Sequence, residues 1–234
     1  MKKINLQTLN LEKLKKRAGI ISIGIILGVC TFVFQIGDYD KEKSSGMIQK
    51  VNGEPIEERI VILDAGHGNP DGGAVSDNGT IEADITLQIT QKVKNILEQE
   101  NIKVILTRSD ENGIYDQNAK TISQKKISDI RNRVKIGNNS KADIFVSIHL
   151  NKIEQEKYWG WQCFFKSNNE KSKKLAESIQ SGLNKTIQKE NTRIPMKINK
   201  VYLVDHVEIP ITVVECGFLS NNEEEKLLQE DEYQ

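Results

Sequence analysis

Two of the three histidines in this chain of 234 residues lie next to short apolar segments. His67 stands in residues 64–68 (Asp-Ala-Gly-His-Gly), directly after the apolar run 59–63, and His149 stands near the end of the run 143–150. If both runs are strands of an open parallel sheet, their carboxyl ends lie at one edge, where such sheets bind ligands. We therefore expect the two imidazoles to emerge at the same edge.

Two carboxylates are expected at that edge as well. Glu215 follows the apolar or β-branched residues 211–214, and Glu82 lies in the first turn of a helix predicted over residues 80–100. Two imidazoles and one carboxylate satisfy three tetrahedral positions of zinc and leave the fourth for water, whose pKa falls to about 7 in such sites. A second carboxylate could then move a proton between water and a leaving group. The set suits hydrolysis of an amide.

Each of these residues also has a structural interpretation. His67 could be a turn residue, His149 a hydrogen-bonded core histidine, and Glu82 a carboxylate that favours the positive end of a helix. Glu215 is harder to explain in this way, because a carboxylate that closes an apolar strand is seldom buried without a partner. The third histidine, His206, is predicted to be a surface residue.

The sequence pattern of residues 58–234 predicts an α/β fold. Apolar runs alternate with amphipathic segments, which is typical of a mostly parallel sheet covered by helices on both faces. Strands are expected at residues 59–63, 102–106, 143–150, 161–165, 201–204 and 211–214, and helices at 80–100, 131–139, 170–187 and 222–230. Residues 108–128 fit neither pattern; stretches of that length are often lids or partly disordered.

The N-terminal part of the chain is predicted to be a transmembrane signal-anchor. Residues 18–36 contain no charged side chain and would span about 28 Å as a helix, close to the bilayer core. Basic residues in 1–17 precede this run, so we expect residue 1 in the cytoplasm and the body on the extracytoplasmic side. Residues 37–57 are predicted to be a linker, and 58–234 the catalytic domain. If the apolar segment were a cleaved signal peptide, the body would be secreted.

Charge and cysteines restrict the partners. Residues 1–36 hold six basic residues and one acidic residue, which leaves the rest of the chain with 27 basic and 32 acidic residues, a net charge of −5. A mildly acidic body does not attract phosphate backbones, so we expect no nucleic acid partner. Cys163 and Cys216 lie in apolar surroundings, and the sequence leaves open whether they pair.

Four segments together resemble the zinc-dependent N-acetylmuramoyl-L-alanine amidases, which hydrolyse bacterial cell wall. They are residues 64–68, Glu82, residues 147–151 (Ser-Ile-His-Leu-Asn) and residues 214–221 (Val-Glu-Cys-Gly-Phe-Leu-Ser-Asn). The resemblance extends from about residue 59 to 230. It implies one three-layer, phosphorylase/hydrolase-like domain with a central sheet of about six strands.

The resemblance also implies roles for individual residues. His67, Glu82 and His149 match the ligands of one Zn²⁺, Glu215 matches the catalytic carboxylate, and Arg133 lies in a helix that packs rather than reacts. The implied substrate is peptidoglycan, cut between the lactyl group of muramic acid and the first L-Ala of the stem peptide. The chain most resembles the amidases of endospore formers that trim cortex peptidoglycan before muramic δ-lactam is made.

Two other functions stay open at this point. A membrane-tethered protein could bind peptidoglycan without cleaving it, or a zinc peptidase could cut within the stem peptide with the same metal chemistry. A cysteine nucleophile is disfavoured, because Cys163 lies within an apolar strand and Cys216 follows Glu215. Whether an accessory protein takes part, and the oligomeric state, are not determined by the sequence.

Overall fold

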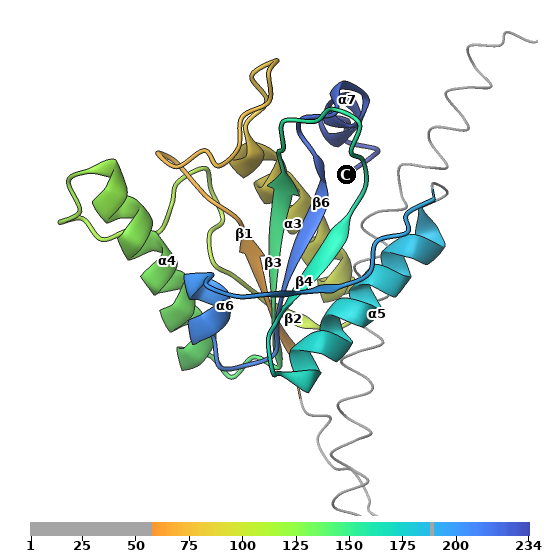
Figure 1. Cartoon of the computed structure of the whole chain (residues 1–234). Helices are drawn as coiled ribbons and strands as arrows, with labels where there is room; N and C mark the ends of the chain where they lie inside the picture. Colours follow the sequence, from red (N-terminus) through yellow and green to blue (C-terminus); the bar gives the residue numbers. More distant parts are fainter. Residues whose placement is uncertain (1–57, 188–189) are drawn as a thin grey trace, which may run out of the picture.

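The computed structural model describes residues 58–187 and 190–234. They form an α/β domain with one central sheet (Figure 1). The strands are β1 (Ile60–Ala65), β2 (Lys103–Leu106), β3 (Ile144–Asn151), β4 (Gln162–Lys166), β5 (Met196–Ile198) and β6 (Ile211–Phe218). The helices are α3 (Glu82–Gln99), α4 (Ile122–Asn139), α5 (Glu170–Thr186), α6 (Tyr202–His206) and α7 (Asn222–Leu228).

The sheet is mostly parallel, as the alternation of apolar runs predicts. Its six strands lie in the order β2-β1-β3-β6-β4-β5. All neighbouring pairs are parallel except β4 and β6, which are antiparallel. Because β4 runs against β6, the first residues of β4 lie beside the carboxyl end of β6. The edge at which β1, β3 and β6 end therefore also receives the start of β4.

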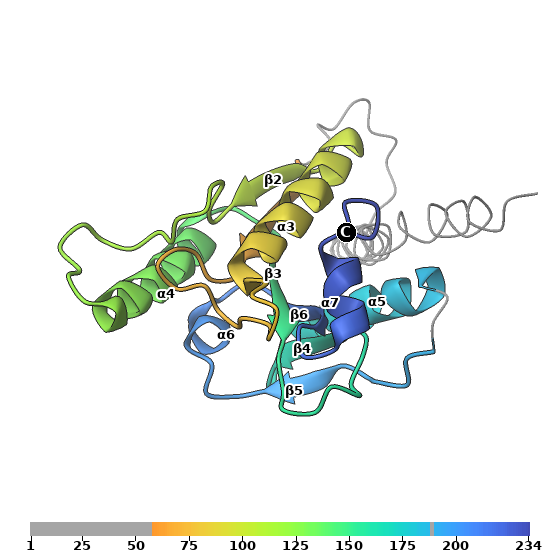
Figure 2. The same cartoon turned by 90° about the horizontal axis from the view of Figure 1, so that it is seen from above.

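Helices cover both faces of the sheet. Figure 2 looks down on the domain and shows α3, α5 and α7 on one side of the sheet and α4 and α6 on the other. The predicted helical spacings explain the first layer, since Ile85, Ile89 and Val93 of α3 and Leu175 and Ile179 of α5 are buried in one apolar cluster. A second cluster fills the space under α4 and α6. The predicted three-layer arrangement is confirmed.

One predicted strand is wrong. Residues 202–204 belong to helix α6, which Val201 precedes as the N-cap, and Leu203 and Val204 are consecutive and both buried. A short apolar run does not distinguish a buried strand from a buried helical turn. Here the backbone hydrogen bonds from Asp205 to Val201 and from Val207 to Leu203 close helical turns, and Leu203 packs in the second apolar cluster. The sixth strand of the sheet is instead β5, which the sequence did not predict because Met196 and Lys197 are exposed and form no apolar run. This strand is held in the sheet by its parallel pairing with β4.

Helix α4 begins nine residues before the predicted helix. Thr121 caps it by accepting a hydrogen bond from the backbone of Gln124, whose side chain reaches back to the cap, and this reciprocal pair stabilises the first turn. The early turns are polar on most sides, and Ile122 and Ile127 are exposed, so the apolar period is weak there. The stretch 108–128 thus contains a loop followed by the start of α4.

Two other expectations concern the membrane and the thiols. The segment 18–36, predicted to cross the membrane, and the linker 37–57 lie outside the described residues. Within the part of the chain that the structure describes, no helix has the length and apolarity to span a bilayer. Cys163 and Cys216 are both free and buried, and each belongs to an apolar cluster, which agrees with a packing role.

A buried ion pair fixes the end of β1 against α4. Asp64 and Arg133 are both almost fully buried, and Arg133 Nη1 contacts Asp64 Oδ1 at 2.5 Å and donates to the carbonyl oxygen of Ala65 at 2.7 Å. Asp64 also accepts hydrogen bonds from Thr107 and Ser147, each at 2.6 Å. The Arg133 guanidinium and these hydroxyls hold the pKa of Asp64 below its usual value although burial alone would raise it.

We expect Arg133→Met to destabilise the domain by about 3–5 kcal/mol, because it leaves the Asp64 carboxylate buried and unpaired. Urea unfolding at fixed zinc concentration measures this loss. Arg131→Met on the exposed side of the same helix is the matched control, with an expected change within about 0.5 kcal/mol. Equal losses in the two variants would contradict a structural role for the Asp64–Arg133 pair.

Candidate metal and catalytic site

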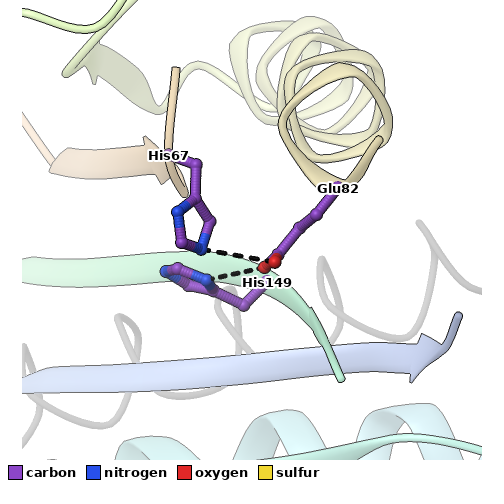
Figure 3. A group of neighbouring side chains, drawn as sticks. All are labelled: His67, Glu82 and His149. Atoms are coloured by element: carbon purple, nitrogen blue, oxygen red, sulfur yellow. Dashed lines mark hydrogen bonds and ion pairs between the residues drawn. The ribbon is translucent and has the colours of Figure 1, made fainter. Parts of the chain in front are cut away.

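The three residues matched to metal ligands meet at the carboxyl edge of the sheet. His67 follows β1, His149 lies in β3 and Glu82 is the first residue of α3, and Figure 3 shows the three side chains converging. Glu82 contacts His67 Nε2 at 3.3 Å and His149 Nδ1 at 2.9 Å. One ligand atom from each residue lies within 4.8 Å of the other two, so the group could hold one metal ion.

The Glu82 carboxylate is held in place by backbone donors. The amides of Ala74 and Leu150 donate to its two oxygens at 2.8 and 3.0 Å. Burial would raise the pKa of Glu82, but the hydrogen bonds with His149 and His67 outweigh it and hold the pKa well below its usual value. Glu82 is therefore ionised at neutral pH and suited to act as an anionic metal ligand.

His67 sits in a strained turn that several side chains stabilise. Its φ of 62° lies in the left-handed region, which is uncommon for a residue other than glycine. Arg133 Nη2 donates to the carbonyl oxygen of His67, and Arg108 Nη2 donates to that of Gly66 at 3.0 Å. The imidazole itself contacts Asp71 through Nδ1 at 3.1 Å. Asp71 thus fixes the orientation of the ring and leaves Nε2 facing Glu82.

Asp71 is in turn bound to α4. Lys126 Nζ contacts the second carboxylate oxygen of Asp71 at 2.9 Å. Burial lowers the pKa of His67, but the hydrogen bonds with Asp71 and Glu82 outweigh that effect and raise the pKa to about 9. The carboxylates around His67 therefore favour a positive charge at this point, whether it is a proton or a metal ion.

Two glycines leave the space that the imidazoles occupy. A Cβ atom on Gly66 would collide with the ring of His149. A Cβ atom on Gly73 would lie 2.5 Å from Glu82 Oε2 and 2.6 Å from the ring of His67, and the φ of Gly73 is +73°. Side chains at these two positions would fill the place where the ligands meet.

Glu215 lies beside this group. It is the register partner of His149 in the β3–β6 pair, so the two side chains project from the same face of the sheet. Its Oε2 atom is buried and has no hydrogen-bond partner among the described residues. Burial raises the pKa of Glu215 to about 7. A carboxyl group with that pKa can both accept and return a proton near neutral pH.

The structure adds residues that sequence reasoning missed. Arg108 is buried and donates to Ala65, Gly66 and Ala83, which ties the His67 turn to the start of α3. Glu225 of α7 is buried and accepts hydrogen bonds from the side chains of Ser76, Asn78 and Thr80, just before Glu82. In the sequence, Arg108 opens the unassigned stretch and Glu225 belongs to an acidic run, so neither signalled burial. His206 is exposed and stacks on Tyr202, away from the site.

The donor set fits zinc. Two imidazoles and one carboxylate are borderline and hard donors of the kind found in hydrolytic zinc sites, where a fourth position stays open. The glycines leave room for the cation, the neighbouring carboxylates favour its charge, and the unpartnered oxygen of Glu215 lies beside it. An α/β domain with this triad and a separate carboxylate is a metal-dependent hydrolase by fold and site.

Comparison with known proteins gives the family. The sequence profile of the Amidase_3 family, described as N-acetylmuramoyl-L-alanine amidase, matches residues 61–234, and the chain belongs to this family. The chain is 34% identical over 212 residues to the germination-specific N-acetylmuramoyl-L-alanine amidase of Bacillus subtilis, covering 91% of this chain and 86% of that protein.

Solved structures agree with this assignment. The CwlD amidase of Clostridioides difficile, solved in complex with the GerS lipoprotein, is similar with a TM-score of 0.73 and 43% identity, over 75% of this chain and 90% of that one. An N-acetylmuramoyl-L-alanine amidase of Clostridium difficile 630 gives a TM-score of 0.65 and 28% identity, over 75% and 88% of the two chains. The predicted family and enzyme class are confirmed.

We expect Asp71→Asn to weaken zinc affinity by roughly 10- to 100-fold, because a neutral amide oxygen accepts from His67 Nδ1 less strongly than a carboxylate does and no longer makes the ring a better donor to the metal. Competition with a chromophoric chelator measures the affinity. Asp77→Asn is the control, since Asp77 is exposed in the same loop and pairs with Lys152 at the surface. Unchanged affinity in Asp71→Asn would show that Asp71 does not orient His67.

Proposed function

We propose that this chain is a zinc-dependent amidase that hydrolyses the amide between the lactyl group of muramic acid and L-Ala of the stem peptide. In this proposal His67, Glu82 and His149 hold one zinc ion, and Glu215 is the catalytic acid and base. The observation that carries the proposal is the convergence of the three side chains beside the half-buried Glu215, one carboxylate oxygen of which is buried without a partner among the described residues. Family membership supports the same substrate bond.

Glu215 performs the proton transfers in this mechanism. Zinc, when bound, supplies a Lewis acid that polarises the scissile carbonyl and lowers the pKa of water. Glu215 accepts a proton from the attacking water while the water oxygen bonds to the carbonyl carbon of the lactyl group. Glu215 then gives that proton to the nitrogen of L-Ala as the carbon–nitrogen bond breaks. The products are a free lactyl carboxyl group and a stem peptide with a free amino terminus.

The backbone around the site keeps these groups in place during the reaction. The amides that bind Glu82 and the carboxylate that binds His67 limit the movement of both ligands. Glu215 lies within a strand rather than on a loop, so its position relative to His149 is set by the register of the sheet. Such preorganisation lowers the cost of orienting the reacting groups.

The biological substrate in our proposal is spore cortex peptidoglycan. The similarity to the germination-specific amidase of Bacillus subtilis and to the CwlD amidase of Clostridioides difficile supports this choice. Removal of the stem peptide exposes the lactyl carboxyl group from which a muramic δ-lactam can form. In spores that contain only an inactive variant, the cortex should therefore keep its stem peptides and lack the lactam.

We further propose that residues 18–36 anchor the enzyme in the membrane with its catalytic domain on the extracytoplasmic side. The proposal rests on the apolar run and on the basic residues before it. The full-length chain should sediment with membranes, and protease added to cells with a permeable wall should remove the domain. A soluble, protected domain would contradict this topology.

An accessory partner is also proposed. The CwlD amidase of Clostridioides difficile was solved in complex with the GerS lipoprotein, which supports a lipoprotein partner for this chain. Affinity purification of the full-length enzyme from sporulating cells should then recover a lipoprotein in stoichiometric amount. Recovery of the enzyme alone, at full activity, would argue that it needs no such partner.

We expect Glu215→Gln to keep about one zinc per chain and to lose roughly 10²- to 10⁴-fold in kcat, because the amide cannot transfer protons. His149→Ala should lose zinc and activity together. Metal analysis and the release of new amino groups from purified peptidoglycan measure both. Glu208→Gln, at an exposed position, is the control and should behave as the wild type. Wild-type turnover by Glu215→Gln would exclude it as the catalytic acid and base.

Mass spectrometry of digested peptidoglycan separates the proposed activity from the alternatives. An amidase releases stem peptides that begin with L-Ala and leaves intact glycan strands. A peptidase of the stem would leave truncated stems attached to muramic acid. Binding to peptidoglycan without any released peptide would indicate a tethered binding protein instead.

A further inference from the structure

Arg193 lies at the edge of the sheet that carries the catalytic carboxylate. Its Nη1 donates to the carbonyl oxygen of Trp159, and the side chain of Gln162 donates to the carbonyl oxygen of Ile194 at 3.0 Å. The segment containing Arg193 thus runs along the first residues of β4. Gln162 is the register partner of Glu215 in the β4–β6 pair. Arg193 is therefore next to the strand position that faces Glu215.

An aromatic platform holds the guanidinium group. Its Cζ atom lies 4.9 Å from the centroid of the Phe218 ring, and this ring stacks on Tyr158 with centroids 6.1 Å apart. The platform is itself anchored, because the buried Glu224 accepts hydrogen bonds from the backbone amides of Phe218 at 2.8 Å and Gly160 at 2.9 Å. Arg193 is thus held between the Phe218 ring at the end of β6 and the backbone of Trp159 just before β4.

The charge of Arg193 has no carboxylate partner within residues 58–187 and 190–234. Its guanidinium donates to the carbonyl oxygen of Trp159 and, at 3.5 Å, to the side chain of Asn191, both of which are neutral. Arg133, by contrast, is paired with Asp64 and Asp129. A half-buried, preoriented guanidinium with free donors is well suited to bind a carboxylate in two-point fashion.

The chemistry of the substrate identifies the carboxylate. The sugars of peptidoglycan are neutral and the lactyl carboxyl group is consumed in the scissile amide, whereas the stem peptide carries free carboxylates beyond its first L-Ala. We propose that Arg193, on the platform of Phe218 and Tyr158, forms a subsite that binds one of these stem-peptide carboxylates. This inference rests on the proposed hydrolysis of the lactyl–L-Ala amide. It implies that the stem peptide of the bound substrate lies on the side of the site formed by β4.

A series of soluble muramoyl-tetrapeptides tests the subsite. In each member one stem carboxylate, either that of the second residue, that of the third or the terminal one, is replaced by the isosteric carboxamide. The wild type should cleave one member with kcat/KM reduced by roughly 10- to 100-fold, mainly through KM, because the Arg193 donors are left without an anion. The member affected identifies which carboxylate binds.

The variant Arg193→Gln should cleave the parent substrate as slowly as the wild type cleaves that member, and it should no longer distinguish the two. Arg193→Lys should recover part of the discrimination, since it keeps the charge without the two-point geometry. The matched control Arg131→Gln, at an exposed position of α4, should discriminate as the wild type does. Zinc content and the thermal midpoint report whether the fold and the metal site are intact.

Two results would overturn the inference. One is equal cleavage of every member of the series by the wild type. The other is that Arg193→Gln lowers kcat/KM by the same factor, relative to the wild type, on every member, including the carboxamide that the wild type already cleaves slowly. That result would mean that Arg193 acts only on the structure. Binding of the same series to Glu215→Gln, measured by calorimetry, tests the subsite without turnover, so failure of the subsite and failure of the proposed hydrolysis give different results.

Discussion

The site depends on the buried charge at the end of β1. Arg133 neutralises Asp64 and at the same time donates to the carbonyl oxygens of Ala65 and His67, so one side chain spans the strand and the turn that follows it. A guanidinium in this position is costly to bury unless its charge and its donors are satisfied. The ion pair therefore stabilises the strained conformation of His67 only when β1, β3 and α4 are packed together.

A second constraint comes from the far end of the chain. The short helix α7 contributes two consecutive buried carboxylates that bind two different parts of the chain. Glu224 binds the backbone of Phe218 and Gly160, and Glu225 binds the side chains of Ser76 and Thr80. The C-terminal helix thereby couples the turn before Glu82 to the strand that carries Glu215. One helix therefore contacts both the turn before Glu82 and the end of the strand that contains Glu215.

The sequence predicted the parts that depend on local pattern and on strand direction. Apolar runs located β1, β3 and β6, and the rule that ligands gather at the carboxyl ends of strands brought His67, His149 and Glu215 to one edge. It did not predict α6 or β5, whose formation depends on packing and on pairing with β4. The sequence also did not indicate that Arg108 and Glu225 are buried. A charged side chain is buried only where hydrogen-bond partners surround it, and the partners of these two residues are distant in the chain.

Glu215 differs from the buried acids of the domain in the partners of its carboxylate oxygens. Asp64 has a guanidinium and two hydroxyls as partners, and Glu225 has two hydroxyls and an amide. Glu215 is half-buried, and its buried Oε2 atom has no hydrogen-bond partner within the described residues. Burial of an unsatisfied carboxyl oxygen destabilises a fold by about 1–3 kcal/mol or more. A group that must take up and release a proton cannot have its oxygens permanently occupied by donors, so the unpartnered oxygen beside His67, Glu82 and His149 supports the proposed role of Glu215.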